Sequence, residues 1–297
     1  MPTPDPQFQQ VADAVDAYMR AYVRDVPLPV RLREAIEYAL LGGGKRLRPT
    51  LAWACCEAAG AAGEASLPGG AAVELVHAFS LVHDDLPAMD DDDLRRGRPT
   101  LHKHADEATA ILAGDAMLAL AFGVIAWPGP GGDARPAEVT SALCAEIVRG
   151  TTGMIAGQVY DTLGGFSEDQ GTPAQLELIH RNKTGALLVG AGRCGALLGG
   201  AGGERLETLT RVCADLGLQF QIVDDLLDAT ADAAEIGKAT GKDADAGKLT
   251  FPVVHGIEAS RGFVAELGTR VGDTLAGFGP EADRLRALTA WLSERTR

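Results

Sequence analysis

Residues 77–93 read HAFSLVHDDLPAMDDDD, and residues 220–228 read FQIVDDLLD. Each stretch carries an apolar run directly into two adjacent aspartates, Asp84-Asp85 and Asp224-Asp225. Two carboxylates at the end of an apolar helix repel each other, and this repulsion raises a pKa unless a cation neutralises them. The repetition of this pattern in two distant segments indicates that these segments carry the chemistry of the protein.

The spacing of the remaining aspartates suggests how a metal is held. Asp224 and Asp228 are four residues apart, about 40° around and about 6 Å along a helix, so their carboxylates share one face. Asp84 and Asp90 would lie about 240° apart on a regular helix. We therefore predict that the helix opens at Pro87 and that a bulge or loop returns Asp90 beside Asp84.

Oxygen ligands suit Mg²⁺, which usually takes one or two carboxylates, waters and a substrate phosphate. The two aspartate clusters therefore predict a diphosphate bridged by Mg²⁺. The run of aspartates at 90–93 would, on its own, be typical of a solvated acidic loop. The presence of two clusters, each closing an apolar helix, favours the functional interpretation.

A diphosphate also needs positive partners. Residues 42–49 read GGGKRLRP, where glycines allow the backbone to approach a phosphate and Lys45 and Arg48 can point to one spot. His77 lies about 20° from Asp84 on the same helix face, although a lone histidine there is more often a core residue. Residues 95–98 read RRGR, which could also be a salt-bridged loop. The other candidate cations are Lys183, Lys238 and Lys248.

The rest of the chain is rich in alanine and leucine, and aromatic residues make up only 5% of it. This composition, with few alternating β-branched runs, predicts an all-α protein. Segments rich in Gly, Pro or charge, at 128–136, 164–173 and 229–248, are expected to be loops and not domain linkers. We expect helices near 8–24, 30–41, 49–60, 69–85, 105–127, 136–160, 173–200, 204–230, 252–267 and 280–296.

Charge and cysteine content exclude some functions. The 27 Lys and Arg against 41 Asp and Glu give a net charge of −14, which argues against a nucleic-acid partner. The five cysteines form no CxxC pair, and the first residues lack the basic flank and apolar core of a signal peptide, so we expect a cytoplasmic protein. Residues 110–127 are apolar apart from Asp115, and we expect a buried core helix there, not a membrane span.

The chain resembles the trans-polyprenyl (isoprenyl) diphosphate synthases, most of all the bacterial short-chain farnesyl diphosphate synthases. The resemblance covers nearly the whole chain and rests on motifs in family order: GGGKRLRP at 42–49, HAFSLVHDDLPAMDDDDLRRGRPTLH at 77–102, ATAILAGDA at 108–116, GMIAGQVYD at 153–161, HRNKTGALL at 180–188, FQIVDDLLD at 220–228 and GKDADAGKLTFP at 241–252. It implies an all-α, single-domain helical bundle of the isoprenoid synthase type around a large central cavity, with one polyprenyl synthase domain over residues 1–297. It also implies a homodimer.

The resemblance assigns a role to each candidate residue. Mg²⁺, three ions per active site with substrate bound, would be held by Asp84, Asp85, Asp90, Asp224 and Asp228, and Asp225 would join the catalytic group. Isopentenyl diphosphate would bind Lys45, Arg48, His77 and Arg96. The allylic diphosphate would bind Arg95, Lys183, Thr184, Gln221, Lys238 and Lys248, and Arg95 and Lys183 would assist catalysis.

The metal ligands and the two diphosphate sites implied by the resemblance predict a reaction by ionisation, condensation and elimination. The allylic C–O bond ionises as the diphosphate departs, the double bond of isopentenyl diphosphate attacks the resulting carbocation, and a proton is lost. No protein nucleophile is needed, but water must be excluded.

The expected product is the C15 compound (2E,6E)-farnesyl diphosphate, made from dimethylallyl and geranyl diphosphates. In the resembling family an aromatic at the position of Phe79 marks short products, and Ser80 leaves room for the tail. Phe79 could instead be an ordinary core ring. The alternatives are a geranylgeranyl diphosphate synthase and a non-catalytic subunit of a heteromeric synthase. A terpene cyclase or an EF-hand Ca²⁺ module fits the motifs less well.

Overall fold

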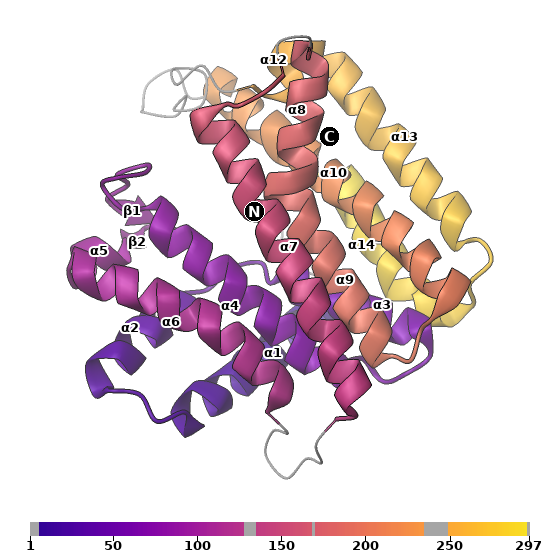
Figure 1. Ribbon diagram of the computed structural model, residues 1–297. Helices are drawn as coiled ribbons and strands as arrows, with labels where there is room; N and C mark the ends of the chain where they lie inside the picture. Colours follow the sequence, from indigo (N-terminus) through magenta and orange to yellow (C-terminus); the bar gives the residue numbers. More distant parts are fainter. Residues whose placement is uncertain (1–5, 128–134, 168–169, 235–248, 296–297) are drawn as a thin grey trace.

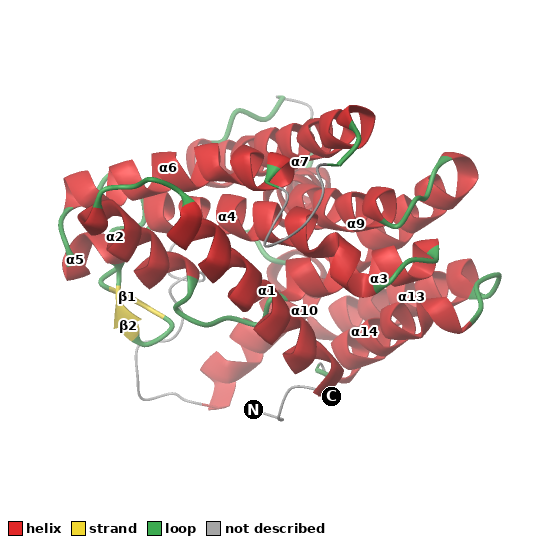
Figure 2. Ribbon diagram, turned by 90° about the horizontal axis from the view of Figure 1, so that it is seen from below, coloured by secondary structure: helices red, strands yellow, loops and turns green. Residues whose placement is uncertain are grey.

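The computed structural model describes residues 6–127, 135–167, 170–234 and 249–295. It confirms the predicted all-α class, and its helices run mostly side by side (Figures 1 and 2). The long helices are α1 (Pro6–Asp25), α2 (Val30–Leu40), α3 (Leu47–Ala59), α4 (Leu67–Asp84), α6 (Glu107–Ala126), α7 (Ala137–Leu163), α8 (Thr172–His180), α9 (Ala186–Leu198), α10 (Gly203–Ala234), α13 (Ile257–Leu275) and α14 (Asp283–Glu294). The short elements are η1 (Gly63–Ser66), α5 (Leu101–His104), η2 (Arg181–Gly185), α12 (Phe251–His255), η3 (Pro280–Ala282), and the strands β1 (Leu94–Arg95) and β2 (Arg98–Pro99).

The structure differs from the predicted elements at several points. Helix α10 continues to Ala234, into the segment predicted as a loop over 229–248, and α13 continues to Leu275, beyond the predicted helix end at 267. The segment predicted as one helix over 173–200 contains a π-helical turn, η2, between α8 and α9. The segment predicted as one helix over 252–267 is broken at Gly256, whose φ of +85° ends α12 before α13 begins. A two-stranded hairpin, β1–β2, follows the acidic run, and its turn residues Arg96 and Gly97 both have positive φ, as a two-residue hairpin turn requires.

Small residues allow the central helices to approach closely. A Cβ atom added to Gly195 of α9 would lie 1.8 Å from the carbonyl oxygen of Ala52 in α3. A Cβ atom added to Gly69 of α4 would lie 2.8 Å from the Cβ atom of Cys194 in α9. Because these contacts involve backbone or short side chains, the packing of α3, α4 and α9 depends on glycine at both positions.

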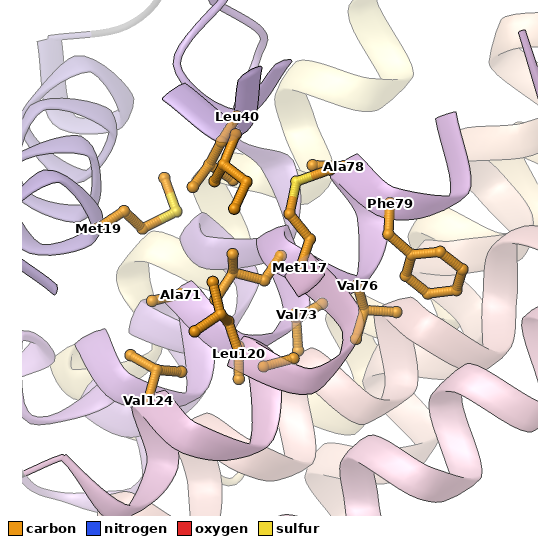
Figure 3. Packing of buried hydrophobic residues seen from close by; sticks show 14 of the residues in the cluster. Met19, Leu40, Ala71, Val73, Val76, Ala78, Phe79, Met117, Leu120 and Val124 are labelled. Atoms are coloured by element: carbon orange, nitrogen blue, oxygen red, sulfur yellow. The ribbon is translucent and has the colours of Figure 1, made fainter. Parts of the chain in front are cut away.

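The largest hydrophobic cluster surrounds α4 and joins it to α1, α2 and α6. Figure 3 shows part of this cluster, with Met19 from α1, Leu40 from α2, Val73 from α4 and Met117 from α6. Further buried apolar residues join α3, α9, α10, α13 and α14, and others join α8, α10, α12 and α13. The core therefore extends along α4 up to the aspartate motif at its end.

Two helical segments are long and apolar enough to cross a membrane by length and composition alone: Gly63–Asp84 and Glu107–Ala126. Within the protein, 72% of the first apolar window is buried, as expected of a core helix, but only 44% of the second. The burial predicted for residues 110–127 is therefore partial. One face of α6 packs on the core, and Ile111 and Leu112 on the same helix are exposed.

We predict that Gly195→Ala destabilises the protein by roughly 1–3 kcal/mol, because the added methyl group forces α9 away from the α3 backbone. Gly272→Ala is the matched control, since Gly272 also lies within a helix but has no atom within 4 Å of an added Cβ. That control should gain up to about 1 kcal/mol from helix propensity. Urea unfolding of both variants measures the difference, and equal stabilities would contradict the close packing of α3 and α9.

Candidate active site

The first aspartate motif adopts the loop predicted from its spacing. Helix α4 ends at Asp84, before Pro87, and the backbone N–H of Asp90 donates a hydrogen bond to the backbone carbonyl of Asp84 at 2.8 Å. Proline cannot continue the helix, so the chain turns back at this point. The structure thus confirms that Asp90 returns beside Asp84.

Asp85 has a different environment from Asp84. Its side chain is buried, and both of its oxygens accept hydrogen bonds from Arg95 of the hairpin, at 2.7 and 2.9 Å from Nε. A second guanidinium nitrogen lies 2.6 Å from Oδ1. This placement favours Asp85 as the counter-ion that fixes Arg95, whereas the sequence predicted a metal ligand.

The second aspartate motif lies within α10, which continues to Ala234, so the prediction that this motif closes an apolar helix is wrong. Asp225 is buried and accepts hydrogen bonds from His180 Nε2 at 3.0 Å, from the backbone N–H of Phe251 at 2.9 Å and from Gln221 Nε2 at 2.9 Å. Both oxygens of Asp225 are therefore occupied by protein groups. Asp224 and Asp228 share the electrostatic environment of Lys45, whose pKa they raise against a larger lowering by burial.

Lys183 and Thr184 are brought to the site by the π-helical turn η2. Lys183 Nζ forms an ion pair with Asp161 of α7, and Thr184 donates a hydrogen bond to Gln221 Oε1 at 2.7 Å. The turn packs directly on α7, where a Cβ atom added to Gly157 would lie 2.0 Å from the Lys183 backbone nitrogen. The hydrogen bond between Thr184 and Gln221 thus brings predicted residues of η2 and α10 into direct contact.

The cations of the GGGKRLRP segment have two different roles. Arg46, in a left-handed backbone conformation, is buried and forms ion pairs with Asp16 at 2.7 Å and with Glu74 at 2.8 Å, so it anchors the segment. The Nε atom of Arg48 is buried and has no hydrogen-bond partner among the described residues. A buried donor without a partner costs free energy, and an anion bound there would supply the missing acceptor.

Arginines gather around His77 and Gly44. Burial lowers the pKa of His77 well below its usual value, and nearby positive charges lower it further: those of Arg46, Arg48, Arg95 and Arg96. The Arg96 guanidinium donates a hydrogen bond to the Gly43 carbonyl and lies where a Cβ atom on Gly44 would have to be. This concentration of positive charge is suited to an anionic ligand.

A cavity of about 590 Å³ begins beside these charged groups. Asp84, Arg48 and Lys183 line it together with apolar residues of α4 and α7, including Phe79 and Met154. An apolar cavity with a few convergent charged groups is the usual form of a small-molecule site. This one can hold a molecule with a charged head and an apolar tail.

Phe79 and Ser80 both line this cavity, as predicted. The Phe79 ring packs edge-on against His83, with ring centroids 5.8 Å apart. His83 Nε2 lies 3.2 Å from the carbonyl oxygen of Ile111, close to Gly114 of α6, where an added Cβ atom would collide with the imidazole. Figure 3 shows the Phe79 ring apart from the side chains of Met19 and Leu40.

The electrostatics of Asp84 indicate a place for a cation. Burial raises the pKa of Asp84 to about 6, Lys183 and Arg95 lower it, and Asp90 and Asp85 raise it. The ionised carboxylate is therefore unfavourable until positive charge is added. Among the described residues, no three His, Cys, Asp or Glu side chains form a ready-made metal site. The carboxylate oxygens of Asp84 and Asp90 are donors that suit Mg²⁺, which takes few carboxylates and completes its shell with phosphate and water.

Three residues of the site were not singled out from the sequence: Asp161, Gln158 and His180. They lie within the motifs GMIAGQVYD and HRNKTGALL, so their position in those motifs was the available signal. Lys238 and Lys248, predicted to bind the allylic diphosphate, fall outside the described residues.

Comparison with known proteins identifies the family. Residues 29–272 match the sequence model of the family described as polyprenyl synthetase. The chain is 45% identical over 269 residues to a chloroplastic geranylgeranyl pyrophosphate synthase of Catharanthus roseus, covering 90% of this chain and 74% of that one. It is 43% identical over 270 residues to the large subunit 1 of a heterodimeric geranylgeranyl pyrophosphate synthase of Arabidopsis thaliana, covering 89% and 72%.

The fold matches a solved structure over almost its full length. The crystal structure of an FPP/GFPP synthase from Zymomonas mobilis has a TM-score of 0.81 and 34% sequence identity, covering 97% of this chain and 98% of that one. The relatives bear out the resemblance to trans-prenyl diphosphate synthases, but their names do not confirm the predicted C15 product. The chain belongs to the polyprenyl synthetase family of prenyltransferases.

Proposed function

We propose that this protein condenses isopentenyl diphosphate with allylic diphosphates and that its main product is the C20 compound geranylgeranyl diphosphate. The observation that carries the proposal is the cavity of about 590 Å³, which joins Asp84, Arg48 and Lys183 to apolar walls on α4 and α7. Such a cavity suits a diphosphate head with a long isoprenoid tail. The names of the curated relatives support the C20 product over the C15 product expected from Phe79.

Arg48, His77, Lys183 and Thr184 line this cavity, and a smaller adjoining cavity of about 60 Å³ is lined by His77, Arg95 and Arg96. We divide the predicted ligands into two groups. Lys45, Arg48, His77 and Arg96 come from the glycine-rich segment, α4 and the hairpin, and we assign isopentenyl diphosphate to them. Arg95, Lys183, Thr184 and Gln221 would face the allylic diphosphate, together with Lys238 and Lys248. Holding the two substrates on separate cations orients them for reaction within one cavity.

Mg²⁺ fits the carboxylate side of the site, because the donors are hard oxygens and because Asp84 needs a positive neighbour. Asp84 and Asp90 would hold it on one wall and Asp224 and Asp228 on the other. When bound, Mg²⁺ neutralises the charge that develops on the departing diphosphate. Lys183 adds a further positive charge there, and the apolar walls exclude water that would quench a carbocation.

The C15 product is the second candidate, because Phe79 lines the cavity in the same helix as Asp84. A ring at this point shortens the space available to a growing tail. The Zymomonas mobilis relative, described as an FPP/GFPP synthase, shows that related proteins are named for products of different lengths.

We also propose that the protein forms a homodimer through α6 and α7. These helices pack against each other and both expose large apolar side chains: Ile111 and Leu112 on α6, and Val148 on α7. A second copy would remove this apolar surface from water. The Arabidopsis relative is named as a subunit of a heterodimer, so a different small subunit is the competing partner.

The substrate test uses purified protein with Mg²⁺, isopentenyl diphosphate and, in turn, the C5, C10 and C15 allylic diphosphates, with products identified by mass. We expect incorporation from all three and accumulation of the C20 diphosphate. Release of C15 with no use of the C15 substrate would reject the C20 assignment, and absence of any incorporation would reject the transferase proposal.

We expect Phe79→Ala to lengthen the main product by at least one C5 unit, because removal of the ring opens the cavity beyond it. Val253→Ala is the control, since Val253 is exposed on α12, lies outside the proposed dimer surface and does not line the cavity. Product chain lengths from matched incubations measure the effect. An unchanged product in Phe79→Ala would assign the ring to the core alone.

Asp84→Asn should lower condensation by at least about a hundredfold, yet raise the stability of the protein in EDTA. The pKa of Asp84 is raised to about 6 in the folded state, so its ionised form destabilises the fold. This destabilisation is fully present above pH 6 and disappears below the unfolded-state pKa of 3.8. The variant should therefore gain roughly 1–3 kcal/mol at pH 8, and the gain should shrink as the pH is lowered towards 4.

Urea unfolding in EDTA at both pH values measures this gain, with the exposed Asp273→Asn on α13 as the control for loss of one carboxylate. A pH-independent difference between Asp84→Asn and wild type would show that ionisation of Asp84 does not strain the fold.

The dimer is tested by the molar mass of the purified protein in light scattering. We expect twice the chain mass of 30.9 kDa for wild type and a shift towards the single-chain mass for Leu112→Glu. Val253→Glu places the same charge on an exposed apolar residue of α12 and should leave the dimer intact. A monomeric wild type would contradict the homodimer and favour a different partner.

A further inference from the structure

His180 and Asp225 form a buried pair behind the predicted allylic diphosphate site. His180 Nε2 lies 3.0 Å from Asp225 Oδ2, and both side chains are less than a tenth exposed. His180 is the last residue of α8, and the π-helical turn that carries Lys183 and Thr184 begins at the next residue. Asp225 is adjacent to the predicted metal ligand Asp224 on α10. The pair therefore joins the element with the cations to the element with the carboxylates.

The hydrogen bonds around Asp225 fix three separate elements. Besides His180, Asp225 Oδ2 accepts from the backbone N–H of Phe251, the first residue of α12, at 2.9 Å. Thr250, the N-cap residue of α12, forms no side-chain cap of its own, so the carboxylate of Asp225 takes that place. Asp225 thereby connects α8, α10 and α12 at one point.

A second chain of bonds leads from Asp225 back to the substrate residues. Asp225 Oδ1 accepts from Gln221 Nε2, and Gln221 Oε1 accepts from the Thr184 hydroxyl at 2.7 Å. Thr184 lines the cavity together with Lys183. His180 is thus connected to the η2 turn both through the backbone and through the hydrogen bonds of Asp225, Gln221 and Thr184.

The ring of His180 has a second contact that can be separated from its hydrogen bond. It stacks on the Phe251 ring, with centroids 5.3 Å apart and 14° between the planes. Packing and hydrogen bonding therefore predict different outcomes for different substitutions. A phenylalanine at position 180 keeps a ring but loses the donor, and a glutamine keeps a donor but loses the ring.

We propose that His180 is a positioning residue that, through its hydrogen bond to Asp225, sets the η2 turn with Lys183 and Thr184 against the carboxylates of α10, so that both sides meet one diphosphate. The inference rests on the proposed function and deepens it. Loss of the donor leaves a buried carboxylate underpaired, and Asp225 then shifts towards other partners. Among the described residues, none of the hydrogen bonds or ion pairs of His180 and Asp225 involves the proposed isopentenyl diphosphate ligands.

The test compares His180→Phe and His180→Gln with wild type, using calorimetric binding of inorganic diphosphate with Mg²⁺ and steady-state kinetics with both substrates. We expect His180→Phe to bind diphosphate at least about tenfold more weakly and to lose at least about tenfold in kcat/KM for the allylic substrate. His180→Gln should stay within about threefold of wild type in both measurements. KM for isopentenyl diphosphate should change by less than about threefold in either variant.

Equal diphosphate affinities in the two variants would overturn the positioning role, because the hydrogen bond would then make no difference. A parallel rise in KM for isopentenyl diphosphate would also overturn it, since a general loss of structure would explain the defect. The wild-type measurement separates this inference from the proposed function. If wild type neither binds diphosphate nor condenses the substrates, the proposed function fails, and the inference with it.

Discussion

One carboxylate of each Asp-Asp pair lies inside the protein, and the arrangement of the active end depends on neutralising it. An unpaired buried charge costs several kcal/mol, so each inner aspartate needs donors within hydrogen-bonding distance. Asp85 is matched by Arg95 of the hairpin, and Asp225 by His180, Gln221 and a backbone N–H. This constraint holds the β1–β2 hairpin beside the end of α4 and the π-helical turn η2 beside the middle of α10. The hairpin and the η2 turn are also the elements that carry predicted diphosphate ligands.

The charged ends are held in place by the close packing of the apolar parts. Gly195 allows α9 to lie on the α3 backbone, and Gly69 does the same between α4 and α9. A densely packed core has few alternative arrangements. Helices held by such packing therefore keep their positions even where several like charges lie close together on them. The buried ion pair between Arg46 and Glu74 ties the glycine-rich segment to α4, so that Arg48 of α3 lies near the same end as Asp84. Packing thus supplies the rigidity that a site of mutually repelling carboxylates requires.

The geometry of adjacent residues could be predicted well from the sequence, but the residues that pair with each buried carboxylate could not. The return of Asp90 to Asp84 followed from the helical repeat and from Pro87, which are properties of adjacent residues. The all-α class was predicted from composition and is confirmed by the structure. The cavity and the presence of Lys183 in it were expected from the family resemblance, and Lys183 does line the cavity. The inward orientation of Asp85 was missed, because it depends on Arg95 in a hairpin that no propensity argument had indicated. Interactions of this kind are set by tertiary contacts, which a helical projection does not contain.

The surroundings of Phe79, which lines the cavity, show how tertiary contacts decide the role of a residue. In the sequence, Phe79 precedes Asp84 by five residues. Its position on a helical projection is compatible with either a place in the core or a place beside the cavity. In the structure the ring rests against His83, which is held by the carbonyl of Ile111 and has room only because position 114 is glycine. His83 therefore braces Phe79 against α6, whereas the described residues that line the cavity come mainly from α4, α7 and η2. The space left for a tail depends on the separation of α4 and α7 as well as on the size of the ring. A family rule based on one aromatic position describes only part of this arrangement, so the ring by itself does not exclude a C20 product.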